Sequence, residues 1–159
     1  MTSKQRDQPN FLYLPKNQWS PRFEDSFYTV RVDSFERLDA SPPNAIAVGH
    51  THHPAFYYKV VLHRGQAKQE MWRRFSQFQW LFHQVKASPP PPVDGAPPLD
   101  PLRLPPGTCW PFQSPELATQ RVDLLSACLD DLLSRPGYAS HPAVLTFLEL
   151  QKDKQEQQS

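Results

Sequence analysis

The stretch EMWRRFSQFQWLFHQV (Glu70–Val85) marks a change of hydrophobic period in the middle of the chain. Its first part belongs to the segment Lys68–Phe75, which predicts a β-strand. The apolar residues that follow recur at helical spacing, and Ser76 with Gln79 fits a capping box at a helix start. A strand is therefore expected to pass directly into an amphipathic helix, with two adjacent arginines at the junction.

Two further strands are expected upstream of this junction. SFYTVRVDSF (Ser26–Phe35) alternates apolar and polar residues, and AFYYKVVLHRG (Ala55–Gly65) is rich in aromatic and β-branched side chains. Residues 39–54 carry Pro, Gly and Asn and predict a loop. Short connections favour antiparallel neighbours, so the three strands are expected to form a meander.

The second half of the chain predicts a proline-rich arm followed by two helices. More than half of the 19 prolines lie between Pro89 and Pro115, where they exclude helix and central strand and favour polyproline II. Ser114, Pro115 and Glu116 form a strong start for a helix that runs to Arg135. A last helix begins near His141 with Pro142 in its first turn.

The expected fold class is therefore α+β. A three-stranded antiparallel sheet packs against a helical subdomain, and the proline-rich arm lies between the first and second helices. The folded domain is predicted over residues 25–150, with a flexible N-terminal arm at 1–24 and a polar tail at 151–159.

Composition excludes several classes of function. The net charge of +1 does not fit a globally basic nucleic-acid binder, so no nucleic-acid partner is expected. Two cysteines are too few for a disulfide scaffold. No apolar run reaches the roughly 20 residues that span a bilayer, and the first residues lack a signal peptide's apolar core. We expect a cytoplasmic protein whose membrane contact is peripheral.

The sequence contains no recognisable catalytic or metal-binding set. It has no Gly-rich phosphate loop, GxSxG elbow or HExxH motif, and nothing places a histidine beside Cys109. The histidines of HTHH (His50–His53) lie in a loop without a matching Cys or Asp cluster. We therefore expect no enzymatic activity, no cofactor and no metal.

The arginines are the most informative residues. Arg73 and Arg74 lie between Trp72 and Phe75, and such aromatic neighbours imply partial loss of hydration, which is costly for a cation without a partner. Arg121 falls inside the apolar arc of its helix. Guanidinium groups bind phosphate bidentately and an aromatic ring offers a flat face, so this combination is suited to a flat anionic ligand.

The order of these motifs resembles a phox homology (PX) domain, as found in small sorting nexins. Three strands are followed by RRFSQFQWL, a proline arm ending in LPPG, the helix RVDLLSACLDDLL and HPAVLTFLEL, over about residues 25–150. The resemblance implies binding of a phosphoinositide headgroup, most often phosphatidylinositol 3-phosphate. It implies that Arg74 binds the 3-phosphate, Phe75 packs against the inositol ring and Arg121 binds the 4- and 5-hydroxyls.

The resemblance also implies a membrane-inserting loop between the proline arm and the following helix. Its candidate residues are Leu104, Cys109, Trp110 and Phe112. An exposed Trp-Pro-Phe tip suits the headgroup level of a bilayer, although burial in the core is the ordinary fate of a loop aromatic.

The sequence departs from the family pattern at one position. Gly107 stands where PX domains usually carry a lysine for the 1-phosphate. Loss of one charge-assisted hydrogen bond, about 1.5–3 kcal/mol, is expected to weaken binding roughly 10- to 100-fold. Arg103 is a weaker substitute, and Arg73 is expected to make a surface ion pair or an auxiliary lipid contact.

Two functions follow from these expectations. The first is a phosphoinositide-binding module that targets the protein to endosomal or vacuolar membranes in membrane trafficking. The alternative is a PX-like protein-interaction adapter with weak or altered lipid binding. That adapter would use the proline-rich arm, through Pro98 and Pro101, or the N-terminal FLYL (Phe11–Leu14).

Overall fold

The computed structural model describes residues 12–13, 27–43, 45–64, 67–91, 101–104, 115–135 and 137–150. The antiparallel strands are β2 (Phe27–Leu38), β3 (Ala55–Arg64) and β4 (Ala67–Arg74). The helices are α2 (Phe75–Ala87), α3 (Pro115–Ser134) and α4 (Pro142–Phe147), and the 3-10 helix η3 (Tyr138–Ser140) precedes α4. The predicted α+β class and the three-stranded antiparallel meander are confirmed.

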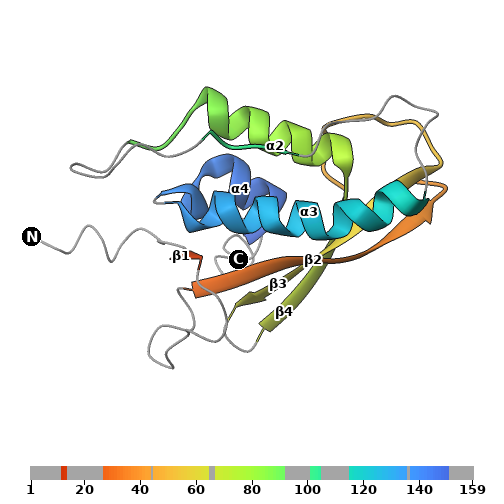
Figure 1. Cartoon of the computed structure of the whole chain (residues 1–159), viewed down its shortest axis with the longest axis horizontal. Coiled ribbons are helices and arrows are strands. Elements are labelled where there is room, and N and C mark those ends of the chain that lie inside the picture. Colours follow the sequence, from red (N-terminus) through yellow and green to blue (C-terminus); the bar gives the residue numbers. More distant parts are fainter. Residues whose placement is uncertain are drawn as a thin grey trace, which may run out of the picture.

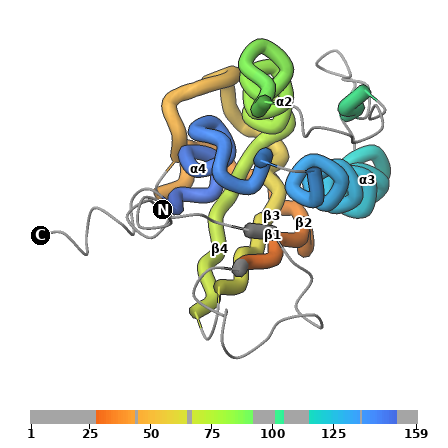
Figure 2. The backbone as a smooth tube through the Cα atoms, turned by 90° about the vertical axis from the view of Figure 1, so that its left-hand side faces the viewer, coloured from red at the N-terminus to blue at the C-terminus, as the bar shows by residue number. Residues whose placement is uncertain are grey.

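The helices α2, α3 and α4 lie together on one side of the sheet (Figure 1), and the view turned by 90° shows the same arrangement (Figure 2). Helix α3 packs on β2, and α2 packs on α4. The residues between sheet and helices form a single core cluster. Its most deeply buried members, none more than 1% exposed, include Tyr28, Val60, Phe78, Leu81, Leu125, Leu129, Val144 and Phe147.

A short fourth strand extends the sheet. β1 (Leu12–Tyr13) pairs in parallel with the start of β2, so the sheet order is β1-β2-β3-β4. Two residues are too few for an alternating pattern, and the sequence therefore predicted an arm here rather than a strand. The other residues of 1–24, and the tail 151–159, lie outside the described residues.

Strand β2 confirms the predicted alternation and continues beyond it. Val30 and Val32 are buried, while Arg31 and Asp33 point outward and form a surface ion pair at 3.5 Å. The register with β3 shifts after Val32, as in a β-bulge, and pairing then continues to Leu38. The strand is therefore longer than its period-two pattern indicated.

The predicted capping box of α2 is wrong by its register. The helix begins two residues earlier, with Arg74 rather than Ser76 as the N-cap residue, in an extended conformation. The side-chain oxygen of Gln77 accepts a hydrogen bond of 2.9 Å from the Arg74 backbone N–H. Ser76 instead accepts, through Oγ, a hydrogen bond of 3.1 Å from the backbone N–H of His50. A tertiary contact thus takes the hydroxyl that local spacing assigned to the cap.

The buried face of α3 includes Arg121 but not Leu124. Leu124 is 50% exposed. Arg121 is only 3% exposed and lies among the buried residues of the helix. The helix is therefore rotated so that its apolar arc faces β2 with the guanidinium inside it.

His141 caps α4 and ties it to the end of α2. Its Nδ1 accepts a hydrogen bond of 3.1 Å from the backbone N–H of Ala143, and its Nε2 lies 2.7 Å from the carbonyl oxygen of Ser88. This network assigns the neutral Nε2–H tautomer, because Nδ1 must accept while Nε2 donates. The predicted helix start at Pro142 is confirmed.

His141→Ala is expected to lower the free energy of unfolding by about 1–2 kcal/mol, because the variant loses the cap and the Ser88 bond together. Urea denaturation followed by circular dichroism measures the loss. His83→Ala on the exposed side of α2 is the matched control and should change stability by no more than about 0.5 kcal/mol. Equal effects of the two substitutions would contradict the assigned role of His141.

Candidate functional site

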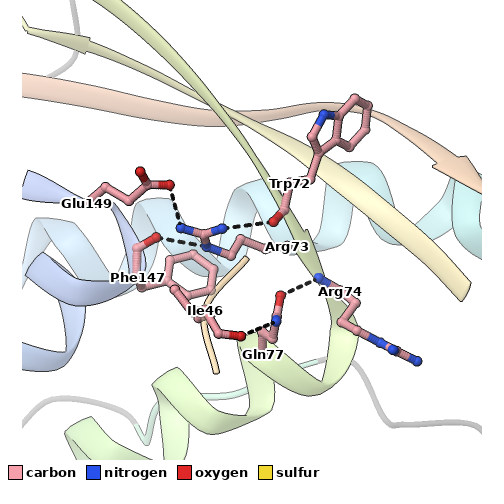
Figure 3. Close-up of polar contacts among 7 residues, drawn as sticks. All are labelled: Ile46, Trp72, Arg73, Arg74, Gln77, Phe147 and Glu149. Atoms are coloured by element: carbon pink, nitrogen blue, oxygen red, sulfur yellow. Dashed lines mark hydrogen bonds and ion pairs between the residues drawn. The ribbon is translucent and has the colours of Figure 1, made fainter. Parts of the chain in front are cut away.

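The junction of β4 and α2 sends its two arginines in opposite directions (Figure 3). Consecutive side chains of a strand point to opposite faces, so Arg73 and Arg74 cannot share one environment. Both are nonetheless buried, at 0% and 4% exposure. The site is built around the different ways in which these two charges are accommodated.

Arg73 is bound within the protein itself. Its Nη2 donates to Glu149 Oε2 at 2.9 Å, its Nε to the Phe147 carbonyl at 3.0 Å and its Nη1 to the Trp72 carbonyl at 2.9 Å (Figure 3). Burial lowers the pKa of Arg73, and the hydrogen bond and charge of Glu149 act in the opposite direction. The expected surface position of Arg73 is therefore wrong: this side chain is a buried link between β4 and the end of α4.

Arg74 is held by backbone oxygens rather than by a carboxylate. Its Nη1 donates to the carbonyls of His50 and His52, both at 2.9 Å. Its Nη2 lies 3.4 Å from the His52 Nε2, and its guanidinium carbon is 5.6 Å from the centre of the Tyr57 ring. No acidic residue in the described part of the chain forms an ion pair with Arg74, and within that part its Nε makes no hydrogen bond. The Nε and Nη2 edge is the fork with which arginine binds phosphate bidentately.

Phe75 and Arg121 meet beside this arginine. The guanidinium carbon of Arg121 lies 3.9 Å from the centre of the half-buried Phe75 ring, a close cation–π contact. Burial raises the pKa of Tyr58, and the charge and hydrogen bond of Arg121 partly oppose that shift. The structure thus joins a residue of α3 to the start of α2, across 46 positions of sequence, counted as 121 minus 75.

Some of the other predicted site residues lie within the described part of the chain, and the rest lie outside it. Arg103 is exposed, and Leu104 is half-buried against the core. Pro101 is exposed. The remaining predicted positions lie outside the described residues, and they are Pro98, Gly107, Cys109, Trp110 and Phe112.

The loop before β3 is the part of the site that the sequence did not predict. His50 and His52 lie in a segment read only as a Pro/Gly-rich connection, yet their carbonyls orient Arg74. A glycine at position 49 is a sequence signal that could have indicated a special loop conformation here. Its φ of 82° is positive, and this conformation favours glycine. Contacts between backbone oxygens and a distant side chain leave no trace in hydrophobic periodicity.

The described residues hold neither a candidate membrane span nor a candidate metal site. None of the helices there is both long enough and apolar enough to cross a membrane. No group of three or more His, Cys, Asp or Glu side chains is arranged there to hold a metal ion.

Comparison with solved structures identifies the fold. A designed CISK-PX domain matches with a TM-score of 0.53 and 20% sequence identity, over 74% of this chain and 95% of that one. The mouse SNX19 PX domain, crystallised with a bound sulphate ion, matches with a TM-score of 0.47 and 19% identity, over 76% of this chain and 94% of that one. No curated protein matches the chain.

The sequence pattern of the PX domain family matches residues 61–151, more than half of the chain. The fold is thus that of a headgroup-binding α+β module, and this chain belongs to the PX domain family. PX domains are non-enzymatic modules that generally bind phosphoinositide headgroups and associate peripherally with membranes. The loop at residues 46–53, which contains the carbonyls that orient Arg74, lies before the segment that matches the family pattern.

Proposed function

We propose that this chain binds phosphatidylinositol 3-phosphate and thereby associates with endosomal or vacuolar membranes, as a sorting-nexin-like protein of membrane trafficking. The observation that carries the proposal is the contrast between two adjacent buried arginines. Arg73 has a carboxylate at 2.9 Å, whereas Arg74 is held by two carbonyls and an imidazole.

A buried cation is costly unless an anion compensates it. The carbonyls of His50 and His52 orient the Arg74 guanidinium but carry no net charge. A phosphate group supplies the missing negative charge and accepts two parallel hydrogen bonds from one edge of the guanidinium. Arg74 is therefore the residue that we assign to the 3-phosphate.

Phe75 and Arg121 complete the proposed site. The Phe75 ring provides an apolar face for the inositol ring, and the Arg121 guanidinium lies on that aromatic ring. Guanidinium N–H groups also donate to hydroxyl oxygens, which supports assigning Arg121 to the 4- and 5-hydroxyls. Arg103 is exposed on the proline arm and is the candidate for the 1-phosphate, because Gly107 stands where PX domains usually carry the lysine for that contact.

Flotation of the protein with vesicles tests the proposal. The panel contains each phosphoinositide at equal mole fraction in phosphatidylcholine, and phosphatidylcholine alone is the baseline. Binding above that baseline, strongest for phosphatidylinositol 3-phosphate, is expected. Binding to none of the phosphoinositides would overturn the lipid function. It would leave as the alternative an adapter role, through the proline-rich arm at Pro98 and Pro101 or through the N-terminal arm.

Trp110→Ala is expected to weaken vesicle binding about tenfold while leaving the affinity for a soluble short-chain headgroup unchanged. Partial burial of an indole in the bilayer contributes about 1.5 kcal/mol, which corresponds to that factor. Flotation and calorimetry measure the two affinities. An equal loss in both would instead assign Trp110 to the protein core.

A further inference from the structure

The loop at residues 46–53 is attached to the β4–α2 junction by side chains of the junction. The Gln77 side-chain amide lies 3.3 Å from the carbonyl oxygens of Ile46 and Val48 (the first drawn in Figure 3). The Ser76 hydroxyl accepts a hydrogen bond from the backbone N–H of His50 at 3.1 Å. With the Arg74 bonds, these contacts make the loop a structural part of the arginine's surroundings.

Gly49 allows this close approach. A Cβ atom at this position would collide with the Ser76 hydroxyl, and the φ of 82° disfavours any other residue. The peptide units on either side of Gly49 are therefore held against the start of α2. This geometry places the next residues of the loop, including His52, beside the guanidinium of Arg74.

The His52 imidazole lies on the edge of Arg74 that we assign to the phosphate. Its Nε2 is 3.4 Å from the Arg74 Nη2. The centre of the His50 ring is 5.4 Å from that of His52. His53 instead stacks on Tyr57 of β3, and its Nε2 lies 2.8 Å from the Tyr57 hydroxyl oxygen. Of the three loop histidines, His52 is the one whose ring contacts Arg74.

We propose that His52 is a second phosphate-binding residue of this site, and that it donates a hydrogen bond to the same phosphate monoester as Arg74 when its imidazole is protonated. The inference rests on the proposed function and adds a proton-dependent donor to it. A neutral imidazole adds no charge at the site, whereas an imidazolium places a second cation beside the guanidinium, where a dianion compensates both.

The direction of the pH dependence follows from the charges around His52. Partial loss of hydration, followed by the positive charges of Arg74, His50 and His53, lowers the pKa of His52 below its ordinary value of 6.5 in the free protein. A bound phosphate opposes this shift, because a nearby anion favours the imidazolium. The complex therefore keeps the proton to a higher pH than the free protein, and affinity increases as the pH falls between the two pKa values.

Calorimetric titration with soluble inositol 1,3-bisphosphate, with inorganic phosphate and with vesicles that contain phosphatidylinositol 3-phosphate tests this inference at about pH 5.5 and about pH 7.5. The variant is His52→Gln, which keeps the backbone carbonyl that binds Arg74. His83→Gln is the matched control, since it removes an imidazole on the exposed side of α2, outside the site. Thermal unfolding verifies that both variants fold.

The ratio of the affinity at the lower pH to that at the higher pH should be about three- to tenfold larger in wild type and His83→Gln than in His52→Gln. A pKa rise of one unit on binding corresponds to a tenfold change in affinity. The titration of the phosphate itself cancels, since it is common to all three proteins. Equal ratios in wild type and His52→Gln would overturn the inference while leaving Arg74-dependent lipid binding intact.

The separate ligands distinguish the possible sources of a pH effect. A His52-dependent ratio for the soluble bisphosphate supports the inference, and the same ratio for inorganic phosphate extends it to free phosphate. A ratio confined to vesicles would overturn it, because the proton would then act at the membrane surface. Absence of binding to every ligand at both pH values would overturn the proposed function and this inference together.

Discussion

Arg74→Gln is expected to lower the affinity for vesicles that contain phosphatidylinositol 3-phosphate at least about 100-fold. Two charge-assisted hydrogen bonds to phosphate contribute about 1.5–3 kcal/mol each, and about 3 kcal/mol in total already corresponds to that factor. The glutamine side chain is uncharged and its amide ends near the position of the Arg74 Nε, so the variant loses the phosphate fork together with the Nη1 bonds to the loop carbonyls. Flotation measures vesicle affinity, and circular dichroism verifies the fold.

Arg31→Gln is the control for loss of one positive charge. Arg31 lies on β2 with its side chain 51% exposed, in a surface pair with Asp33. Its substitution should change vesicle affinity less than about threefold, because screened surface charges contribute little. Arg121→Gln should give an intermediate loss, since neutral hydroxyls accept weaker hydrogen bonds than phosphate does. Equal effects of Arg74→Gln and Arg31→Gln would contradict a specific phosphate contact.

Glu149→Ala is expected to destabilise the fold by about 3–5 kcal/mol, because it leaves the buried charge of Arg73 without its carboxylate. The Arg73 side chain is 1% exposed and that of Glu149 is 12% exposed, so water compensates little of the loss. Urea denaturation measures the change in the free energy of unfolding. Headgroup affinity of the folded fraction should remain close to that of wild type.

Asp33→Ala is the matched control for loss of an ion pair. Asp33 pairs with Arg31 on β2 at 3.5 Å, and both side chains are exposed, at 42% and 51%. Exposed ion pairs contribute about 0.2–1 kcal/mol, so this substitution should be nearly neutral. Combining Glu149→Ala with Arg73→Met should recover part of the lost stability, because an apolar side chain replaces the uncompensated charge. Equal destabilisation by Glu149→Ala and Asp33→Ala would contradict the role of the Arg73 pair.

The elements of the fold were predictable because their signals are local. Alternation in β2 buries Val30 and Val32, and the helical spacing that follows Arg74 produces α2. Pro115 and Pro142 begin the two later helices as expected. A predicted helix boundary was wrong where a tertiary contact competed with a local signal. The backbone N–H of His50 donates to the Ser76 hydroxyl that local spacing assigned to the helix cap.

The candidate site was only partly predictable. Arg121 was recognisable as a cation inside an apolar helical arc, and the structure places it 3.9 Å from the Phe75 ring. The local sequence pattern could not separate the environments of Arg73 and Arg74. Their environments depend on Glu149, which is 76 residues from Arg73, and on backbone carbonyls of a loop more than 20 residues before Arg74.

The sequence by itself therefore determined the α+β fold, the order of its elements and the residue types at the junction of β4 and α2. Hydrophobic period and proline position act over a few residues, so they do not depend on contacts between distant parts of the chain. Only the tertiary structure decided that Glu149 compensates the charge of Arg73, while the carbonyls of His50 and His52 orient Arg74. The physical reason is that the cost of a buried charge depends on which distant groups the fold brings within hydrogen-bonding distance.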